Sequence, residues 1–144
     1  MANALDQLLA AARARIERLA AVDVPAAIAD GAVLVDIRTA EQRRRDGVIA
    51  GSIWYPRNCL EWRCAPDAEH RDPLVAEASG PVLLLCKQGY QTSLAAATLC
   101  DLGVRAGDVI GGFAAWVEAG LPVEAHDPAR HGMQGSERAS IRDY

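Results

Sequence analysis

A cysteine stands where a short apolar run gives way to a helical pattern, and this junction constrains the fold more than any other stretch. The apolar run is Val82–Leu85, the loop covers residues 86–93, and the helical pattern covers residues 94–102. Four consecutive apolar residues before a glycine-containing loop indicate a buried strand. We therefore expect a strand, a tight loop and a helix in succession, with Cys86 at the carboxyl end of the strand.

Cys86 is a candidate nucleophile because of the helix that is expected to follow it. Converging N–H groups at a helix N-terminus stabilise an anion, which here is a thiolate. Lys87, the only lysine in the sequence, is the next residue. The alternative is that Cys86 is simply a buried cysteine at a strand end, a frequent environment for an isolated cysteine.

Short apolar runs and helical patterns alternate along most of the chain. Strand-like runs cover residues 33–37, 51–56, 82–85 and 109–110, and helical patterns cover residues 24–30, 39–45, 72–78 and 113–119. Thr39 with Gln42 fits a capping box, and Asp72 before Pro73 fits a helix N-cap. This alternation is typical of an α/β fold in which helices cover both faces of a mostly parallel sheet. Sites in such sheets form beyond the carboxyl ends of the strands, where Cys86 is expected.

The pattern divides the 144 residues into three segments. Apolar residues from Leu5 to Leu19 recur at helical spacing, so residues 1–22 are expected to form an amphipathic helix that packs on the domain. Residues 23–125 carry the alternating pattern and are expected to form that domain. Residues 126–144 have no hydrophobic period and are rich in Gly, Ser, Arg and Asp, which predicts an extended or mobile tail.

Composition excludes several classes of function. The net charge is −4, which gives no support to a nucleic-acid-binding role. No apolar run is long enough to span a membrane, and charged residues interrupt the N-terminal pattern, so neither a membrane partner nor a signal peptide is expected. Four cysteines without an export signal are expected to be reduced, which predicts a cytoplasmic protein.

Three stretches in order resemble the signature of the rhodanese (thiosulfate sulfurtransferase) superfamily. They are the strand with Asp36, Arg38 and Glu41 followed by residues 47–52, the loop of residues 86–93, and the Gly-Gly…Trp…Gly-x-Pro pattern of residues 111–123. The resemblance implies a single-domain, three-layer rhodanese-like fold. It also implies a sulfurtransferase in which Cys86 carries a sulfur atom, as a persulfide, from a donor such as thiosulfate to a thiol or protein acceptor.

The resemblance also implies a set of site residues. The loop would bind substrate and persulfide, with Asp36 and Arg38 in support; the loop residues concerned are Lys87, Gln88, Gly89, Tyr90, Gln91 and Thr92. Gln91 stands where the family's loop carries an arginine, which would help to hold an anionic donor. Lys87, Arg57 and Arg63 are the candidates to supply the missing positive charge. Thr92 and Ser93 are also expected to cap the helix after the loop.

The other three cysteines have different expected roles. Cys59 is a candidate second thiol near Cys86, Cys100 is expected in the core, and Cys59 and Cys64 with His70 lack a fourth zinc ligand. Neither a metal nor another cofactor is expected.

One alternative function is a non-catalytic rhodanese-like module that binds partners or senses redox state or persulfide. A phosphatase or arsenate reductase is the other, although that chemistry needs a longer loop closing on an arginine.

Overall fold

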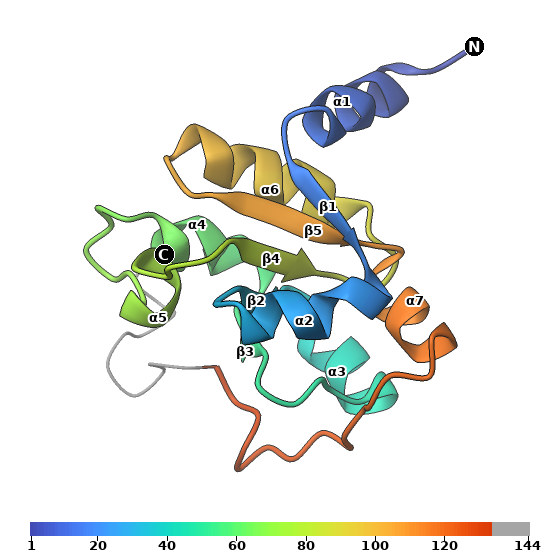
Figure 1. Cartoon of the computed structure of the whole chain (residues 1–144), viewed down its shortest axis with the longest axis vertical. Helices are drawn as coiled ribbons and strands as arrows, with labels where there is room; N and C mark the ends of the chain where they lie inside the picture. The colour runs from blue at the N-terminus through green and yellow to red at the C-terminus, as the bar shows by residue number, and fades with distance from the viewer. Residues whose placement is uncertain (134–144) are drawn as a thin grey trace.

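The computed structural model describes residues 1–133, which form a parallel five-stranded sheet with helices on both faces (Figure 1). The strand order is β1-β5-β4-β2-β3, and every neighbouring pair is parallel. The strands are β1 (Glu17–Ala20), β2 (Val33–Asp36), β3 (Ile53–Trp54), β4 (Val82–Leu85) and β5 (Ala106–Ile110). The predicted α/β class with a parallel sheet is confirmed.

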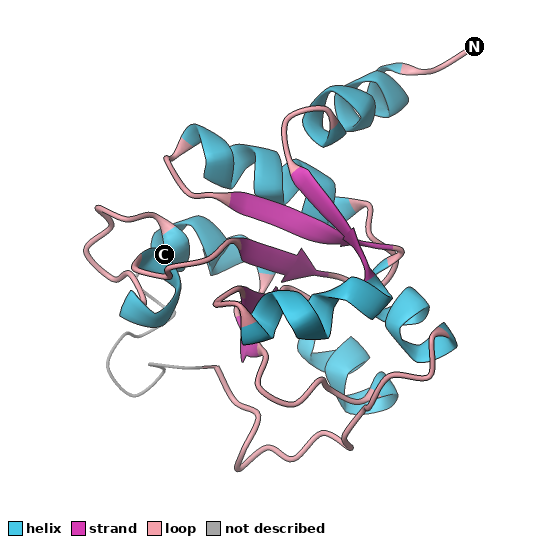
Figure 2. Ribbon diagram, viewed as in Figure 1, coloured by secondary structure: helices cyan, strands magenta, loops and turns pink. Residues whose placement is uncertain are grey.

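Different helices cover the two faces of the sheet (Figure 2). The α-helices are α1 (Ala4–Arg13), α2 (Val24–Ala29), α3 (Ala40–Asp46), α4 (Leu60–Cys64), α5 (Pro73–Ala76), α6 (Gln91–Asp101) and α7 (Gly112–Glu118). Two short 3-10 turns, η1 (Ala21–Asp23) and η2 (Arg57–Cys59), precede α2 and α4. Buried side chains of α4, α5 and α6 pack on one face, and those of η1, α2 and α7 pack on the other. Within residues 1–133, no helix combines the length and apolar character needed to cross a membrane.

The central strand β4 shows why the apolar run folds as a strand. Val82 and Leu84 point into the cluster under α6, whereas Leu83 and Leu85 point into the cluster under α7. All four side chains are buried, because both faces of a parallel sheet are covered by helices. The sequence therefore shows a continuous apolar run instead of alternation, and the strand delivers Cys86 to the carboxyl edge of the sheet.

Two of the predicted helix caps, at Thr39 and Asp72, are confirmed. Thr39 Oγ1 accepts from the backbone N–H of Gln42, and the Gln42 side chain accepts from the N–H of Thr39, so a capping box begins α3. Asp72 caps α5 by accepting from the N–H of Leu74. Both caps use orphan N–H groups of a first helical turn.

The N-terminal prediction needs correction. The helix ends at Arg13, and the following residues form the edge strand β1, which pairs with β5. Pairing with β5 satisfies backbone groups of this segment, and this tertiary contact overrides the helical spacing that continues in the sequence. Helix α1 contacts α6 and buries Ala12, but it projects from the domain, with Leu5 63% and Leu8 57% exposed (Figure 1).

Residues 126–133, the first part of the predicted extended or mobile tail, contact the domain. Glu124 forms a β-bridge with Val48, and Arg43 donates from Nη2 to the carbonyl oxygen of His131 at 3.0 Å. Met133 is buried in the cluster under α6. These contacts hold the first part of the predicted tail on the domain, and the rest, residues 134–144, lies outside the described residues.

Candidate active site

Cys86 follows β4 directly and lies in a shallow pocket at the carboxyl edge of the sheet. Its sulfur accepts the backbone N–H of Gly89 at 3.2 Å and lies 3.5 Å from Oγ1 of Thr92. The residue is only 6% exposed. A pocket of about 280 Å³ reaches it, lined by Gln42, Cys86, Lys87, Gln88, Tyr90 and Gln91. The structure thus gathers most of the predicted loop residues around one thiol that a small molecule can reach.

Gly111 and Gly112 lie where α7 begins, and the lack of a side chain at Gly112 lets that helix approach the cysteine loop. The N-terminus of α7 donates from Phe113 N to the carbonyl oxygen of Cys86 at 2.8 Å and from Ala114 N to that of Lys87 at 3.0 Å. A Cβ atom on Gly112 would lie 2.4 Å from the Cys86 oxygen, which is far inside contact distance. Gly112 also has a φ of +60°, and the loop glycine, Gly89, has a φ of +78°. Glycine is the only residue that adopts these positive φ angles without strain, and at Gly112 it also avoids a clash with the Cys86 carbonyl oxygen.

Thr92 and Ser93 do not cap α6, so that prediction is wrong. Within residues 1–133, the N-cap position of α6 is Tyr90, and no side chain caps it. Both hydroxyls are buried and donate to Oδ2 of Asp108, at 3.0 Å from Thr92 and 2.7 Å from Ser93. Because Thr92 Oγ1 also lies next to the sulfur, a hydrogen-bonded path joins Cys86 to this carboxylate.

Asp108 is a site residue that sequence reasoning missed. It is fully buried in β5, and Arg18 on β1 binds it through two contacts, Nε to Oδ1 at 2.8 Å and Nη2 to Oδ2 at 3.3 Å. One signal could have identified Asp108: it stands next to the apolar run Val109–Ile110, where a strand was expected. An aspartate buried in such a strand needs hydrogen-bonding or charged partners. No local pattern indicates that the partner lies 90 residues away.

Lys87 is the cation of the pocket. Among residues 1–133, it is the only positively charged side chain that lines the pocket. Its Nζ lies 3.0 Å from Oδ2 of Asp46 on α3, and its side chain remains 37% exposed. Hydrogen bonds from Arg45 and from Lys87 hold the pKa of the Asp46 carboxyl well below its ordinary value. The lysine is therefore anchored to α3 and still accessible from solvent.

Arg57 and Arg63 are not brought to the pocket, in contrast to the prediction. Arg57 pairs with Glu61 at 2.6 Å, and Arg63 donates to the Tyr55 hydroxyl at 3.2 Å and to the carbonyl oxygen of His70. In the described part of the chain, neither arginine is among the pocket residues. The segment that carries them folds as η2 and α4 against the face of the sheet, not beyond the strand end.

Asp36 supports the neighbouring strand end. Its Oδ1 accepts the backbone N–H of Arg38 at 3.0 Å, and its carboxylate pairs with the guanidinium groups of Arg38 and Arg43. All three side chains are almost completely buried. Burial lowers the pKa of Arg43, while the charge of Asp36 acts in the opposite direction. The Arg38 guanidinium also lies 3.9 Å from the centre of the Phe113 ring, which connects this group to the start of α7.

The other cysteines lie apart from the pocket. Cys59 is buried, with its sulfur 3.9 Å from that of Met133, and it does not line the pocket that the described residues form around Cys86. Cys64 is buried in the same cluster, and burial raises its pKa to about 12. Cys100 is half-buried on α6. At neutral pH, Cys64 is a thiol without ready access, which leaves Cys86 as the best-placed nucleophile.

Comparisons with known proteins agree with this geometry. The sequence model of the rhodanese-like domain matches residues 20–119. A Rhodopseudomonas palustris protein of unknown function, described as a possible tyrosine phosphatase, is 32% identical, with 86% of this chain and 96% of that chain covered and a TM-score of 0.77. Among curated proteins, none is significantly similar to this chain.

Two further solved structures share the fold. A rhodanese-related protein from Thermoplasma volcanium is 27% identical, with 78% and 99% of the two chains covered and a TM-score of 0.56. A thiosulfate sulfurtransferase from Pseudomonas aeruginosa is 22% identical over 76% of this chain and 19% of its own, with a TM-score of 0.62. With its parallel sheet, its cysteine loop and the family match over residues 20–119, the chain belongs to the rhodanese-like domain family.

Proposed function

We propose that the protein is a sulfurtransferase in which Cys86 carries a sulfane sulfur between a small donor and a thiol or other nucleophilic acceptor. The observation that carries the proposal is the thiol itself, which ends β4, faces a pocket and receives the N–H of Gly89 at 3.2 Å. An N–H donor at this distance stabilises a thiolate, which is the reactive form of cysteine. The same donor remains available when the sulfur carries a second sulfur atom.

The first half-reaction loads the enzyme. The Cys86 thiolate attacks the outer sulfur of thiosulfate, the bond between the two thiosulfate sulfurs breaks, and sulfite leaves with the electron pair of that bond. The product is a Cys86 persulfide. No net oxidant is needed, because the sulfane sulfur passes from one sulfur partner to another. This is covalent catalysis in which the enzyme retains the sulfane sulfur atom of the donor.

The second half-reaction restores the enzyme. An acceptor thiolate attacks the outer sulfur of the persulfide, the sulfur–sulfur bond to Cys86 breaks, and Cys86 leaves as the thiolate. The acceptor departs as a persulfide. Because donor and acceptor use the same site in turn, ping-pong kinetics are expected.

Lys87 gives the pocket a preference for anionic donors. Thiosulfate is a dianion, and Lys87 is the one cationic side chain among the described residues that line the pocket. Its contact with Asp46 fixes the side chain beside the pocket and leaves it partly exposed. A single lysine acts as a point charge and does not provide the bidentate grip of an arginine. We therefore expect weak binding of thiosulfate and a role for an acceptor protein or a larger donor.

A phosphatase is the second candidate, because the Rhodopseudomonas palustris relative is described as a possible tyrosine phosphatase. Transfer of a phosphoryl group requires strong charge neutralisation of its oxygens, typically by arginine. In the described part of the chain, the Cys86 pocket is lined by no arginine, and Gln91 occupies the loop's arginine position. Among the described residues, the pocket therefore lacks the arginine that phosphoryl transfer typically uses.

Intact-mass measurement after incubation with thiosulfate tests the proposal. The wild-type protein is expected to gain the mass of one sulfur atom, to lose it on addition of cyanide or a thiol, and to gain nothing in the Cys86→Ser variant. Hydrolysis of a small aryl phosphate that depends on Cys86 would support the phosphatase instead. Failure to take up sulfur from both thiosulfate and 3-mercaptopyruvate would favour a non-catalytic binding or sensing module.

A further inference from the structure

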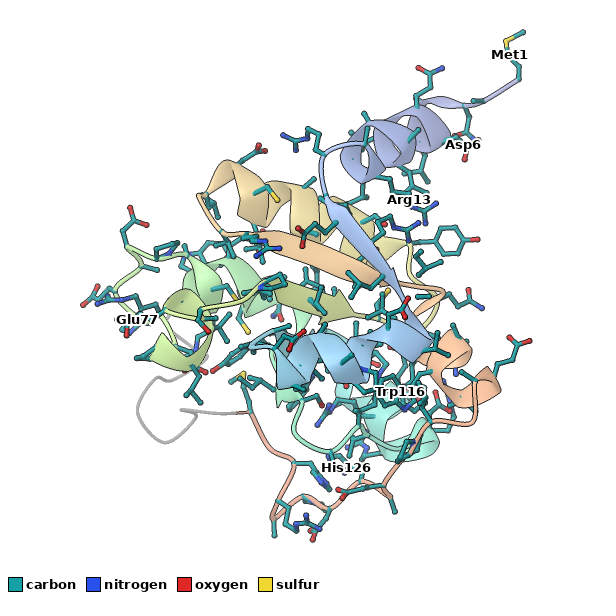
Figure 3. The ribbon with its side chains drawn as sticks, viewed as in Figure 1. Met1, Asp6, Arg13, Glu77, Trp116 and His126 are labelled. Carbon is teal, nitrogen blue, oxygen red and sulfur yellow. The ribbon has the colours of Figure 1, made fainter. Side chains whose placement is uncertain are left out.

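Two arginines from the N-terminal segment converge on the backbone of the cysteine loop. Arg13, at the end of α1, donates from Nη2 to the carbonyl oxygen of Gly89 at 2.9 Å, and Arg18, in β1, donates to the same oxygen at 3.3 Å. Nε of Arg13 also donates to Oγ of Ser93 at 3.0 Å. Figure 3 labels Arg13 where α1 meets the body of the fold. Both arginines precede residues 20–119, the part of the chain that matches the family.

The sheet register places Arg18 beneath the loop. In the parallel pairing of β1 with β5, Arg18 is the direct partner of Asp108. The side chain of Arg18 is 20% exposed, whereas Asp108 is fully buried, so the guanidinium neutralises a carboxylate that has no access to water. Thr92 and Ser93 donate to the same carboxylate. Arg18 therefore binds both the buried carboxylate and the loop carbonyl above it.

Gly89 is the residue that links these arginines to the nucleophile. Its N–H is the donor to the Cys86 sulfur, and its carbonyl oxygen is the acceptor of Arg13 and Arg18. Its φ of +78° is a conformation that glycine adopts freely, but glycine also has more alternatives than any other residue. Contacts that fix its carbonyl oxygen reduce those alternatives and keep the N–H aimed at the sulfur.

We propose that Arg13 and Arg18 are positioning residues for Cys86, which hold the cysteine loop through the Gly89 carbonyl oxygen. The catalytic part of this inference rests on the proposed function, because it assigns the two arginines to the cysteine that would carry the sulfur. The effect on the thiol itself does not depend on which substrate the cysteine attacks. An ordered N–H donor and nearby cations both favour the thiolate over the thiol.

Other charged groups lie around the loop, and Arg13→Gln leaves them unchanged. From the loop and α3 these are Lys87 and Asp46, which pair with each other. From β5 it is Asp108. The Arg13 guanidinium itself stands 5.4 Å from the centre of the Tyr90 ring, so the ring covers one side of it.

The test is the pH dependence of Cys86 alkylation by iodoacetamide, followed by mass spectrometry of the peptide that contains Cys86. Arg13→Gln is the main variant, because Arg13 binds only neutral acceptors in the loop and its loss leaves no buried carboxylate unpaired. We expect the pH of half-maximal alkylation to rise by about half a unit, with alkylation at pH 7 roughly threefold slower. Arg18→Gln and Arg18→Lys are companions: the first is expected to shift the profile in the same direction, and the second to restore most of it.

Arg15→Gln is the matched control. Arg15 lies on the same segment, but it pairs with Asp101 on the exposed side of α6. Circular dichroism and a thermal melt establish that each variant is folded at the assay temperature. If folded Arg13→Gln gives the same profile as Arg15→Gln, the inference is overturned. Sulfur loading is measured in parallel: a shifted alkylation profile together with a wild-type protein that takes up no sulfur would remove the proposed function and leave the positioning role in place.

Discussion

Asp36 and Asp108 are both fully buried carboxylates on parallel strands, and both bind arginine, but their partners come from different parts of the chain. The partners of Asp36 are Arg38 and Arg43, two and seven residues away, and all three side chains are buried. The charged partner of Asp108 is Arg18, from the far end of the chain and partly exposed to solvent. The two groups thus share a chemistry and differ in sequence distance and in contact with the cysteine.

We therefore infer that the Asp36 group mainly stabilises the fold, whereas the Asp108 group also affects the Cys86 thiol. The Asp36 group contacts the Phe113 ring through the Arg38 guanidinium, and Phe113 in turn donates its backbone N–H to the Cys86 carbonyl oxygen. The Asp108 group reaches it directly, because Thr92 donates to Asp108 and lies 3.5 Å from the Cys86 sulfur. Substitutions in the first group should therefore change stability, whereas those in the second should also change the reactivity of Cys86.

Asp36→Asn is expected to have the largest effect on stability. It leaves Arg38 and Arg43 buried beside a neutral amide, and an unpaired buried charge costs about 3–5 kcal/mol of unfolding free energy. Urea denaturation measures that loss. Asp101→Asn is the matched control, because it removes an exposed aspartate that also pairs with one arginine. If the folded fraction of Asp36→Asn alkylates Cys86 with an altered pH profile, the division between the two groups is wrong.

Asp108→Asn is expected to cost less stability and to change Cys86 more. Arg18 can turn toward solvent, and the amide oxygen still accepts from Thr92 and Ser93, so a loss of about 1–3 kcal/mol is expected. Removal of one negative charge near the sulfur favours the thiolate, so the pH of half-maximal alkylation should fall, opposite to the shift expected for Arg13→Gln. A rise, or no change, would contradict the assignment of Asp108 to the cysteine group.

The same comparison explains how much of the molecule could be predicted from the sequence. Local signals sufficed where partners are close in the chain, as for the capping box at Thr39 and the N-cap at Asp72. They failed for β1, whose residues continue a helical period but pair with β5. They failed again for Arg18, because only the register of that strand pair brings it to Asp108. Contacts set by strand order cannot be read from residue spacing.

Lys87→Met is expected to have the smallest effect on the fold and a selective effect on the donor. The contact of Lys87 with Asp46 is partly exposed, so the stability loss should stay below about 0.5 kcal/mol. Loss of the pocket cation should slow sulfur loading from thiosulfate roughly fivefold, and less at high salt, whereas alkylation by iodoacetamide should slow less, because that reagent is neutral. Arg45→Met is the control, because Arg45 pairs with the same Asp46 carboxylate but does not line the pocket. Equal slowing in both variants would mean that Asp46 and not the pocket charge is responsible, and Lys87 would then join the groups that support the fold.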